Sequence, residues 1–247
     1  MRRMTGVFVT GTDTGVGKTL VSAALVRRLA QTGHRVGVMK PVETGVDAGA
    51  LDESDAARLM AAAAVNDSLD LVSPYRFPAP VAPFSAAEAQ GEHIALSEIV
   101  RRYERLAARY PCVVVEGAGG LLVPMGHDWD MSDLISRLSL PVVLVGRVGL
   151  GGINHALLTL EALERRRTRV LALFLNETAL STTPVQRKQC ASTVALLKKR
   201  VSVPLLGPLP YQLPLEGRWN ETVEQLAGSQ PISELAELVW NAGEETS

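Results

Sequence analysis

The fold of this chain follows from one stretch near its beginning, Gly6-Val7-Phe8-Val9-Thr10-Gly11-Thr12-Asp13-Thr14-Gly15-Val16-Gly17-Lys18-Thr19. The residues up to Thr10 are mostly apolar and β-branched, which predicts a short buried strand. Residues 20–31 have a helical period, with apolar side chains on one side. Between the two lies a glycine-rich loop that ends in a lysine and a threonine. Backbone N–H groups in such a loop and at a helix N-terminus bind polyphosphates, so the stretch predicts a phosphate site.

This loop is similar to the phosphate-binding loop (P-loop) pattern Gly-x-x-x-x-Gly-Lys-[Ser/Thr]. It is a variant, because Thr12 stands where the first glycine belongs and Gly11 comes one residue earlier. Lys18 can reach β- and γ-phosphate oxygens, and the hydroxyl of Thr19 can bind Mg²⁺. A strand-to-helix turn without a ligand is the alternative. The predicted nucleotide contacts in this loop are Thr12, Asp13, Thr14, Gly15, Val16, Gly17, Lys18 and Thr19.

Short apolar segments alternate with segments of helical period along the chain. This alternation predicts an α/β fold, a P-loop NTPase-like parallel sheet with helices on both faces, and a single domain over residues 1–247. The predicted strands are Gly6–Thr10, Arg35–Lys40, Cys112–Glu116, Pro141–Gly146, Val170–Leu175 and Val203–Leu206. The predicted helices are Leu20–Gln31, Leu96–Arg109, Asn154–Arg166 and Pro184–Arg200. The longest irregular segment is Pro74–Pro83, which we expect to pack over the sheet edge or to line a substrate pocket.

The composition excludes several classes of protein. The chain has 26 acidic and 25 basic residues, and this balance argues against a general nucleic-acid binder and against a membrane-surface protein. Its two cysteines have no CxxC spacing, so neither a disulfide scaffold nor a thiolate zinc site is expected. No apolar run approaches the roughly 18 residues that a membrane span needs. We therefore expect a cytoplasmic enzyme or binding protein with small-molecule ligands.

Charged residues at three further positions are candidates for the phosphate site. Lys40 follows the second predicted strand and can place a second cation on a transferring phosphoryl group. Glu116 follows the third strand, in the position that holds Mg²⁺ in P-loop enzymes. Asp55 begins a predicted helix, where an acid also complements the helix dipole. An ordinary exposed lysine and a flexible turn are the alternatives for the first two.

Three later segments are weaker candidates. The glycines from Gly149 to Gly152 precede a helix whose N-terminus suits an anion such as a substrate carboxylate. Asn176 ends the fifth predicted strand and can offer an amide donor and acceptor to a base edge. Residues 206–210 end the next strand and can supply an apolar wall. Turn and capping roles are alternatives for all three.

Taken in order, these motifs resemble those of the dethiobiotin synthetase family, ATP-dependent enzymes of biotin synthesis. The resemblance spans about residues 5–210 and depends on the order and spacing of the motifs. The motifs are Thr-Gly-Thr-Asp-Thr…Gly-Lys-Thr at 10–19, Lys-Pro-Val…Thr-Gly at 40–45, Ser-Asp at 54–55, Glu-Gly-Ala-Gly-Gly at 116–120, Leu-Gly…Ile-Asn-His at 150–155, Asn176, and Leu-Leu-Gly…Pro at 205–210.

The resemblance implies a reaction of 7,8-diaminopelargonate with CO₂, with ATP as co-substrate and Mg²⁺ as metal. A carbamate of one amine would attack the γ-phosphate to give a carbamic-phosphoric anhydride, and the second amine would close the ring. The implied catalytic residues are Lys18, Lys40 and Thr14, with Thr44 as a hydrogen-bond donor to the substrate. The implied Mg²⁺ ligands are Thr19, Asp55 and Glu116.

The resemblance further implies a homodimer that shares its substrate site between subunits. The substrate carboxylate would be bound by the partner's turn, made of Gly151, Gly152, Ile153 and Asn154. The remaining implied nucleotide contacts are Glu116, Gly119, Asn176 and Pro208, the last two at the adenine. Two departures stand out, since some members carry an acid in place of Gly15 and some have a histidine in place of Phe84.

Other P-loop proteins remain as alternatives. An ATP-dependent amide ligase of the cobyrinate-amidating type has a similar nucleotide domain, but its usual glutaminase domain would not fit in this chain. A partition-type switch ATPase usually has a second lysine inside the loop, where this chain has Asp13. A regulatory module that has lost its activity would not be expected to retain Lys18, Thr19, Asp55 and Glu116 together. The sequence leaves open whether the nucleotide is ATP or CTP.

Overall fold

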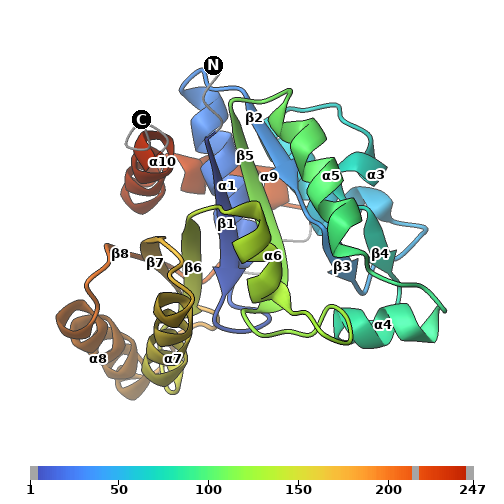
Figure 1. The fold of residues 1–247 in the computed structure, drawn as a ribbon. Coiled ribbons are helices and arrows are strands. Elements are labelled where there is room, and N and C mark those ends of the chain that lie inside the picture. The colour runs from blue at the N-terminus through green and yellow to red at the C-terminus, as the bar shows by residue number, and fades with distance from the viewer. Residues whose placement is uncertain (1–4, 213–216, 243–247) are drawn as a thin grey trace.

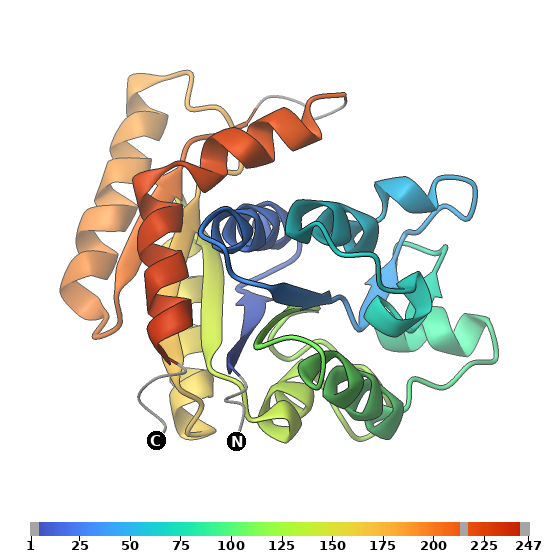
Figure 2. The ribbon, with the colours of Figure 1, turned by 90° about the horizontal axis from the view of Figure 1, so that it is seen from above.

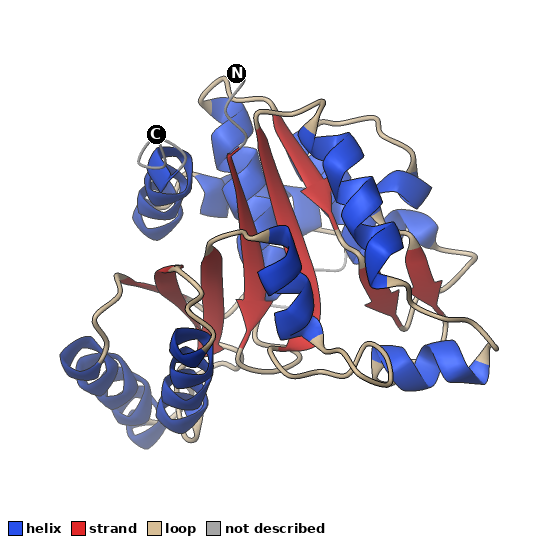
Figure 3. Cartoon of the chain, in the orientation of Figure 1, coloured by secondary structure: helices blue, strands red, loops and turns tan. Residues whose placement is uncertain are grey.

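Six parallel strands form the central sheet of the computed structural model, which describes residues 5–212 and 217–242 (Figure 1). In the order of the sheet they are β2 (Val36–Met39), β5 (Cys112–Gly120), β1 (Thr5–Gly11), β6 (Val142–Arg147), β7 (Val170–Asn176) and β8 (Leu205–Leu209). Every pairing among them is parallel. The predicted α/β fold is confirmed, and helices alternate with these strands along the chain (Figure 3).

Helices cover both faces of the sheet, as the view from above shows (Figure 2). One face packs against α1 (Lys18–Gln31), α2 (Asp55–Ala63), α9 (Trp219–Ala227) and α10 (Gln230–Ala242). The other packs against α5 (Leu96–Ala107), α6 (Met131–Leu138), α7 (Gly152–Arg165) and α8 (Pro184–Arg200). Near the β2 edge lie the short helices α3 (Leu69–Val72) and α4 (Pro83–Ala89). Within the described residues, no helix is both long enough and apolar enough to cross a membrane.

Alternate residues of each strand enter opposite halves of the core. In β1, Val7 and Val9 pack on the face that holds α1, whereas Phe8 between them packs on the opposite face. All three are fully buried, and so is Cys112 of β5, whose pKa burial raises to about 12. A parallel sheet covered on both faces needs apolar side chains on both sides, which explains the continuous apolar runs in the sequence.

The strand order places the binding edge at the end of β1. The chain passes from β1 to β2 and β5 on one side, and then crosses to β6, β7 and β8 on the other. A crevice forms outside the carboxyl ends of parallel strands where this order reverses. The loop that follows β1 stands at that point, at the lower edge of the sheet in Figure 1.

The structure corrects two details of the sequence analysis. Strand β5 continues to Gly120, so Glu116 lies inside a strand, opposite Val9 of β1, and not directly after it. The segment 74–83 is irregular only in part, because it contains β4 (Tyr75–Phe77), which pairs in parallel with β3 (Val42–Thr44) in a separate two-stranded sheet. Each of these strands has only three residues, which is too short for an alternating pattern to predict a strand.

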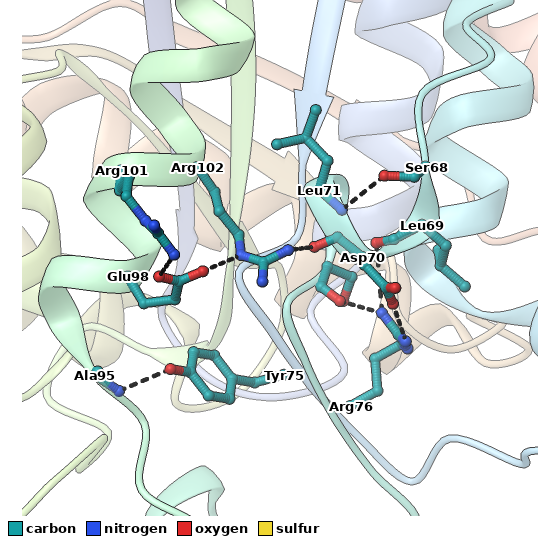
Figure 4. A network of polar contacts seen from close by, with 11 residues as sticks. Ser68, Leu69, Asp70, Leu71, Tyr75, Arg76, Ala95, Glu98, Arg101 and Arg102 are labelled. Atoms are coloured by element: carbon teal, nitrogen blue, oxygen red, sulfur yellow. Dashed lines mark hydrogen bonds and ion pairs between the residues drawn. The ribbon is translucent and has the colours of Figure 1, made fainter.

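A polar network holds β4 between its neighbours (Figure 4). The hydroxyl oxygen of Tyr75 accepts a hydrogen bond from the backbone N–H of Ala95 at 3.0 Å. Arg76 donates to the carboxylate of Asp70 at 2.7 Å, and Arg102 of α5 donates to the backbone carbonyl of the same residue. The segment therefore packs at the edge of the fold, and none of residues 74–83 lines the cleft described below.

Candidate active site

A cleft of about 480 Å³ opens at the carboxyl edge of the sheet, above the loop between β1 and α1. Its lining comes from the phosphate loop and from the segments that follow β2, β7 and β8, together with part of β5 and the first turn of α2. Many residues expected at the site lie here: Thr14, Gly15, Val16, Gly17, Lys18, Thr19, Lys40, Thr44, Asp55, Gly119 and Asn176. The fold thus gathers into one cleft residues from both halves of the chain.

The phosphate loop leaves the N-terminus of α1 open to an anion. The N-cap of α1 is Gly17, with φ +92°, and no side chain accepts hydrogen bonds from the first N–H groups of the helix. A Cβ at Gly17 would lie 2.3 Å from Nδ2 of Asn176, so only glycine fits there. Lys18 turns back over the loop, and its Nζ donates to the carbonyl oxygen of Asp13 at 2.9 Å. The helix dipole and the ammonium group together favour a bound phosphate.

A second lysine joins two carboxylates next to this loop. Lys40 Nζ lies 2.6 Å from Oε1 of Glu116 and 2.9 Å from Oδ2 of Asp55. The hydroxyl of Thr19 donates to the same Glu116 oxygen at 2.8 Å. Glu116 is fully buried and Lys40 is nearly so, whereas 30% of the Asp55 side chain is exposed. Four residues that the sequence analysis singled out therefore form one connected cluster.

The charges in the cluster set each other's protonation. Burial opposes the charged form of Lys40, but Glu116 and Asp55 outweigh it and raise the pKa of Lys40 above its ordinary value. Burial also opposes ionised Asp55, yet Lys40 holds the pKa of Asp55 below its ordinary value. For Lys18, burial and the repulsion from Lys40 lower the pKa to about 8. Lys18 thus lacks sufficient negative charge around it until an anion enters the cleft.

The oxygen atoms of this cluster fit a hard divalent cation. Oε2 of Glu116 is buried and has no hydrogen-bond partner among the described residues. A buried carboxylate oxygen normally needs a donor or a metal. Carboxylate and hydroxyl oxygens are the ligands that Mg²⁺ prefers, and Thr19, Asp55 and Glu116 offer both kinds. Because no three His, Cys, Asp or Glu side chains of the described residues converge, Mg²⁺ here would also need water or phosphate oxygens.

Three other residues of the predicted site shape the phosphate loop. The backbone N–H of Thr12 donates to the carbonyl oxygen of Val145 at 2.9 Å and so ties the loop to β6. The carboxylate of Asp13 accepts from the N–H of Thr14 at 2.7 Å. A Cβ at Gly119 would lie 3.6 Å from the Thr14 hydroxyl, so β5 closely approaches the loop at this point.

The structure separates Asn176 and Pro208, both expected at the base. Asn176 is buried at the end of β7, where its Nδ2 donates to the carbonyl oxygen of Val16 at 2.8 Å. Its Oδ1 has no partner among the described residues. Pro208 lies within β8 and does not line the cleft, whereas Leu209 and Tyr211 do. Asn176 therefore supports the phosphate loop as well as facing the cleft.

The turn Gly151–Asn154 lies outside this cleft. It follows β6 at the carboxyl edge of the sheet, and Gly151, with φ +83°, is the N-cap of α7. No side chain caps this helix, and both Gly151 and Asn154 are exposed. Gly152 is buried and its N–H donates to the carbonyl oxygen of Gly149, so Gly151 and Asn154 are the residues of the turn that face outward.

The cleft also contains residues that the sequence analysis did not single out. Glu43 is buried and lies three residues after Lys40, inside the Lys-Pro-Val…Thr-Gly motif at 40–45. Arg58 follows Asp55 by one helical turn, and its guanidinium lies 4.7 Å from the ring centre of Trp219 at the rim. Glu43 and Arg58 could have been predicted at the site from their short distances in sequence from Lys40 and Asp55. Nothing in the local sequence indicated Trp219, because α9 reaches the cleft only through tertiary packing.

Solved structures share this fold at low sequence identity. A chain of the MinC:MinD cell division protein complex of Aquifex aeolicus matches with a TM-score of 0.58 at 16% identity, over 98% of this chain and 97% of that one. Cobyrinic acid a,c-diamide synthase of Mycobacterium smegmatis, solved with ADP and magnesium, matches with a TM-score of 0.53 at 15% identity, over 99% and 97%. These likenesses confirm the P-loop NTPase fold and carry no information about activity.

Sequence relatives are far more similar. A family model described as an AAA domain matches residues 5–218. The ATP-dependent dethiobiotin synthetase BioD of Anaeromyxobacter dehalogenans is 49% identical over 175 residues, which cover 71% of this chain and 78% of that protein. The protein of the same name from Thermodesulfovibrio yellowstonii is 40% identical over 83% of this chain and 88% of its own length. With most of its phosphate-site residues gathered at one cleft and relatives this similar, the chain belongs to the ATP-dependent dethiobiotin synthetase family.

Proposed function

We propose that this chain converts 7,8-diaminopelargonate, CO₂ and ATP into dethiobiotin, ADP and phosphate, and that it does so as a single domain. The observation that carries the proposal is the cluster of Lys18, Lys40, Asp55, Glu116 and Thr19 at one P-loop, in a chain whose relatives are named for this synthesis.

The reaction would bring a carbamate anion against the triphosphate of ATP. Two like unit charges 4 Å apart repel by about 4 kcal/mol at an effective dielectric constant of about 20. Lys40 is suited to face the carbamate, because its raised pKa keeps it charged at neutral pH. Lys18 is suited to face the phosphates, which supply the negative partner it lacks. Two buried ammonium groups would therefore offset much of the repulsion.

The proposed reaction has three bond-forming steps. One amine of the substrate forms a C–N bond to CO₂ and loses a proton, which gives the carbamate. A carbamate oxygen attacks the γ-phosphorus, the bond to the ADP oxygen breaks, and a carbamic-phosphoric anhydride forms. The second amine then attacks the carbonyl carbon, loses a proton and expels phosphate as the ring closes. Lys18, Lys40 and Thr14 would hold the transferring group in line, and Thr44 would donate a hydrogen bond to the carbamate.

Thr19, Asp55 and Glu116 would hold Mg²⁺. The buried, unpaired Oε2 of Glu116 supports this assignment, since its other oxygen already accepts from Lys40 and Thr19. When bound, the ion would neutralise part of the negative charge of the β- and γ-phosphates.

The base of the nucleotide would lie where β7 and β8 end. Asn176 Oδ1 is an acceptor with no partner in the part of the chain that the structure describes, and it suits the exocyclic amino group that adenine and cytosine share. The segment after Pro208 would supply an apolar wall, while Gly119 would let the phosphates approach β5. Competition between ATP and CTP for binding will decide which nucleotide is used.

A homodimer would complete the site. The turn Gly151–Asn154 has an open helix N-terminus that suits the substrate carboxylate, but it lies outside the cleft of its own subunit. Large apolar side chains are exposed on and beside α7 and α8, and these are Leu150, Leu158, Leu180, Val185 and Leu196. Exposed apolar side chains on these two neighbouring helices support contact with a second copy of the chain, which would bring the turn to the neighbouring cleft.

Purified protein tests the function directly. We expect diaminopelargonate, bicarbonate, ATP and Mg²⁺ to give dethiobiotin, detected by mass spectrometry, with one ADP released for each product molecule. Lys18→Ala should lower turnover by about 10²- to 10³-fold, while Lys199→Ala, on an exposed part of α8, should leave it unchanged. ADP release that does not need the diamine would contradict the proposal and favour a switch ATPase. Amide formation from glutamine would favour an amide ligase.

A further inference from the structure

The buried carboxylate of Glu43 points at the first turn of α2. Glu43 belongs to β3, and only 7% of it is exposed. Its Oε1 accepts a hydrogen bond from the backbone N–H of Asp55 at 2.6 Å, and its Oε2 accepts from the N–H of Ala56 at 3.3 Å. One carboxylate thus serves both of the first N–H groups of the helix.

With these contacts, the N-terminus of α2 is fully capped by the protein itself. The side chain of Ser54 accepts from the N–H of Ala57 at 3.2 Å, and its carbonyl oxygen accepts from the N–H of Arg58. Helix α1, by contrast, has no side-chain cap. The phosphates therefore find an open helix N-terminus at α1, whereas at α2 the protein's own carboxylate takes the place of an anion.

The capped turn carries a residue of the proposed metal site. Asp55 is the first residue of α2, and its carboxylate lies 2.9 Å from Lys40 Nζ. Lys40 is joined to Glu116 and through it to Thr19. A shift of the N-terminus of α2 would therefore move Asp55 relative to every other member of the cluster.

The ionised form of Glu43 is disfavoured at this position. Burial, together with repulsion from Asp55, raises the pKa of Glu43 above its ordinary value. A neutral glutamine would avoid this repulsion, but only one of its two terminal atoms is an acceptor, so the N–H groups of Asp55 and Ala56 would no longer each have an oxygen of their own. The carboxylate gives each of the two N–H groups its own oxygen, and this arrangement fixes the position of the N-terminus of α2.

We infer that Glu43 is a positioning residue, which holds the N-terminus of α2 so that the Asp55 carboxylate faces Lys40 and the Mg²⁺ site. This inference rests on the proposed function, because it concerns the same cleft. Glu43 itself makes no contact with Lys40, Glu116 or Thr19 through a hydrogen bond or ion pair in the described structure. It acts through Asp55.

The test is ATP affinity, measured by calorimetry in EDTA and again with Mg²⁺. In EDTA, Glu43→Ala should bind ATP within about twofold of wild type, because the phosphate loop is untouched. Its gain in affinity on adding Mg²⁺ should fall by about tenfold, as found for residues that orient metal ligands. Glu43→Gln, which keeps one acceptor, should show a smaller loss and guards against misfolding of the alanine variant.

A matched control and a double variant separate positioning from plain stability. Asp130 is the N-cap of α6, where its Oδ1 accepts from the N–H groups of Ser132 and Asp133, but it does not line the cleft. Asp130→Ala should lower the melting temperature and keep the full Mg²⁺ gain. Asp55→Ala should lose the gain, and adding Glu43→Ala should lower it no further, because Glu43 acts through Asp55.

Two results would overturn the inference. One is a Glu43→Ala protein that melts earlier yet keeps the wild-type gain from Mg²⁺. The other is a double variant in which the losses of Mg²⁺-dependent ATP affinity from Glu43→Ala and Asp55→Ala add together. If the wild-type protein itself bound no ATP, the proposed function would fail, and the inference would fail with it.

Discussion

Lys40 Nζ lies 2.6 Å from Oε1 of Glu116, and the register of the sheet brings the two residues together. Met39 of β2 is paired with Val115 of β5, so the next residue of each chain segment falls at the same level. Glu116 is fully buried on β5, which lies between β1 and β2. A carboxylate in that position needs a cation, and Lys40 is the one that the register supplies.

This pairing predicts that loss of the lysine destabilises the fold. Lys40→Met keeps most of the side-chain volume but leaves Glu116 as an uncompensated buried charge, which should cost about 3–5 kcal/mol of unfolding free energy. Adding Glu116→Gln removes that charge and should restore most of the loss. Urea unfolding in EDTA at neutral pH measures the stability of the single and the double variant. A Lys40→Met protein as stable as wild type would show that the ion pair is unimportant for folding.

The low pKa of Lys18 predicts that ATP binding takes up a proton. Lys18 has a pKa of about 8 in the free protein, so it loses its charge as the pH rises above this value. Bound phosphate favours the ammonium form, and its pKa must then be higher in the complex. ATP affinity should therefore fall above about pH 8, by up to tenfold per pH unit. Calorimetry in buffers of different ionisation enthalpy should detect proton uptake in wild type and none in Lys18→Met.

Two glycines of the phosphate loop should differ in their tolerance of alanine. Both have positive φ, +73° at Gly15 and +92° at Gly17, so each alanine variant carries backbone strain of about 1–2 kcal/mol. A Cβ at Gly17 would also meet Asn176 Nδ2 at 2.3 Å, whereas nothing lies within 4 Å of a Cβ at Gly15. Gly17→Ala should lose ATP binding, and Gly15→Ala should retain it. Equal affinities in the two variants would argue against the close contact with Asn176.

The exposed leucine Leu158 on α7 predicts a dimer that a single charge can break. Leu158 is 57% exposed, and Leu158→Asp should give monomers in analytical ultracentrifugation. If Gly151–Asn154 completes the neighbouring cleft, the variant should also lose turnover while still binding ATP. Val81→Asp, at another exposed apolar residue, should leave the assembly unchanged. A wild-type protein that sediments as a monomer while fully active would refute the shared site.

Local sequence was sufficient to predict the phosphate loop, the parallel sheet and the main charged residues of the site. A strand, a glycine-rich loop and a helix follow one another within residues 5–31, and the interactions that define them span only a few residues. The apolar runs of β5, β6 and β7 indicated a covered parallel sheet for the same reason. Lys40, Asp55 and Glu116 stood out because their residue types and their places beside strands and helices match the chemistry of phosphates and cations.

Tertiary structure alone decided how these residues act on one another. No local pattern states that β2 lies beside β5, and without that neighbour Lys40 would lack the buried carboxylate of Glu116. The role of Glu43 depends on the approach of β3 to α2, and the position of Trp219 depends on the packing of α9 against the same core. Strand order, register and burial come from contacts between distant segments, whereas sequence patterns report only what neighbouring residues impose on each other.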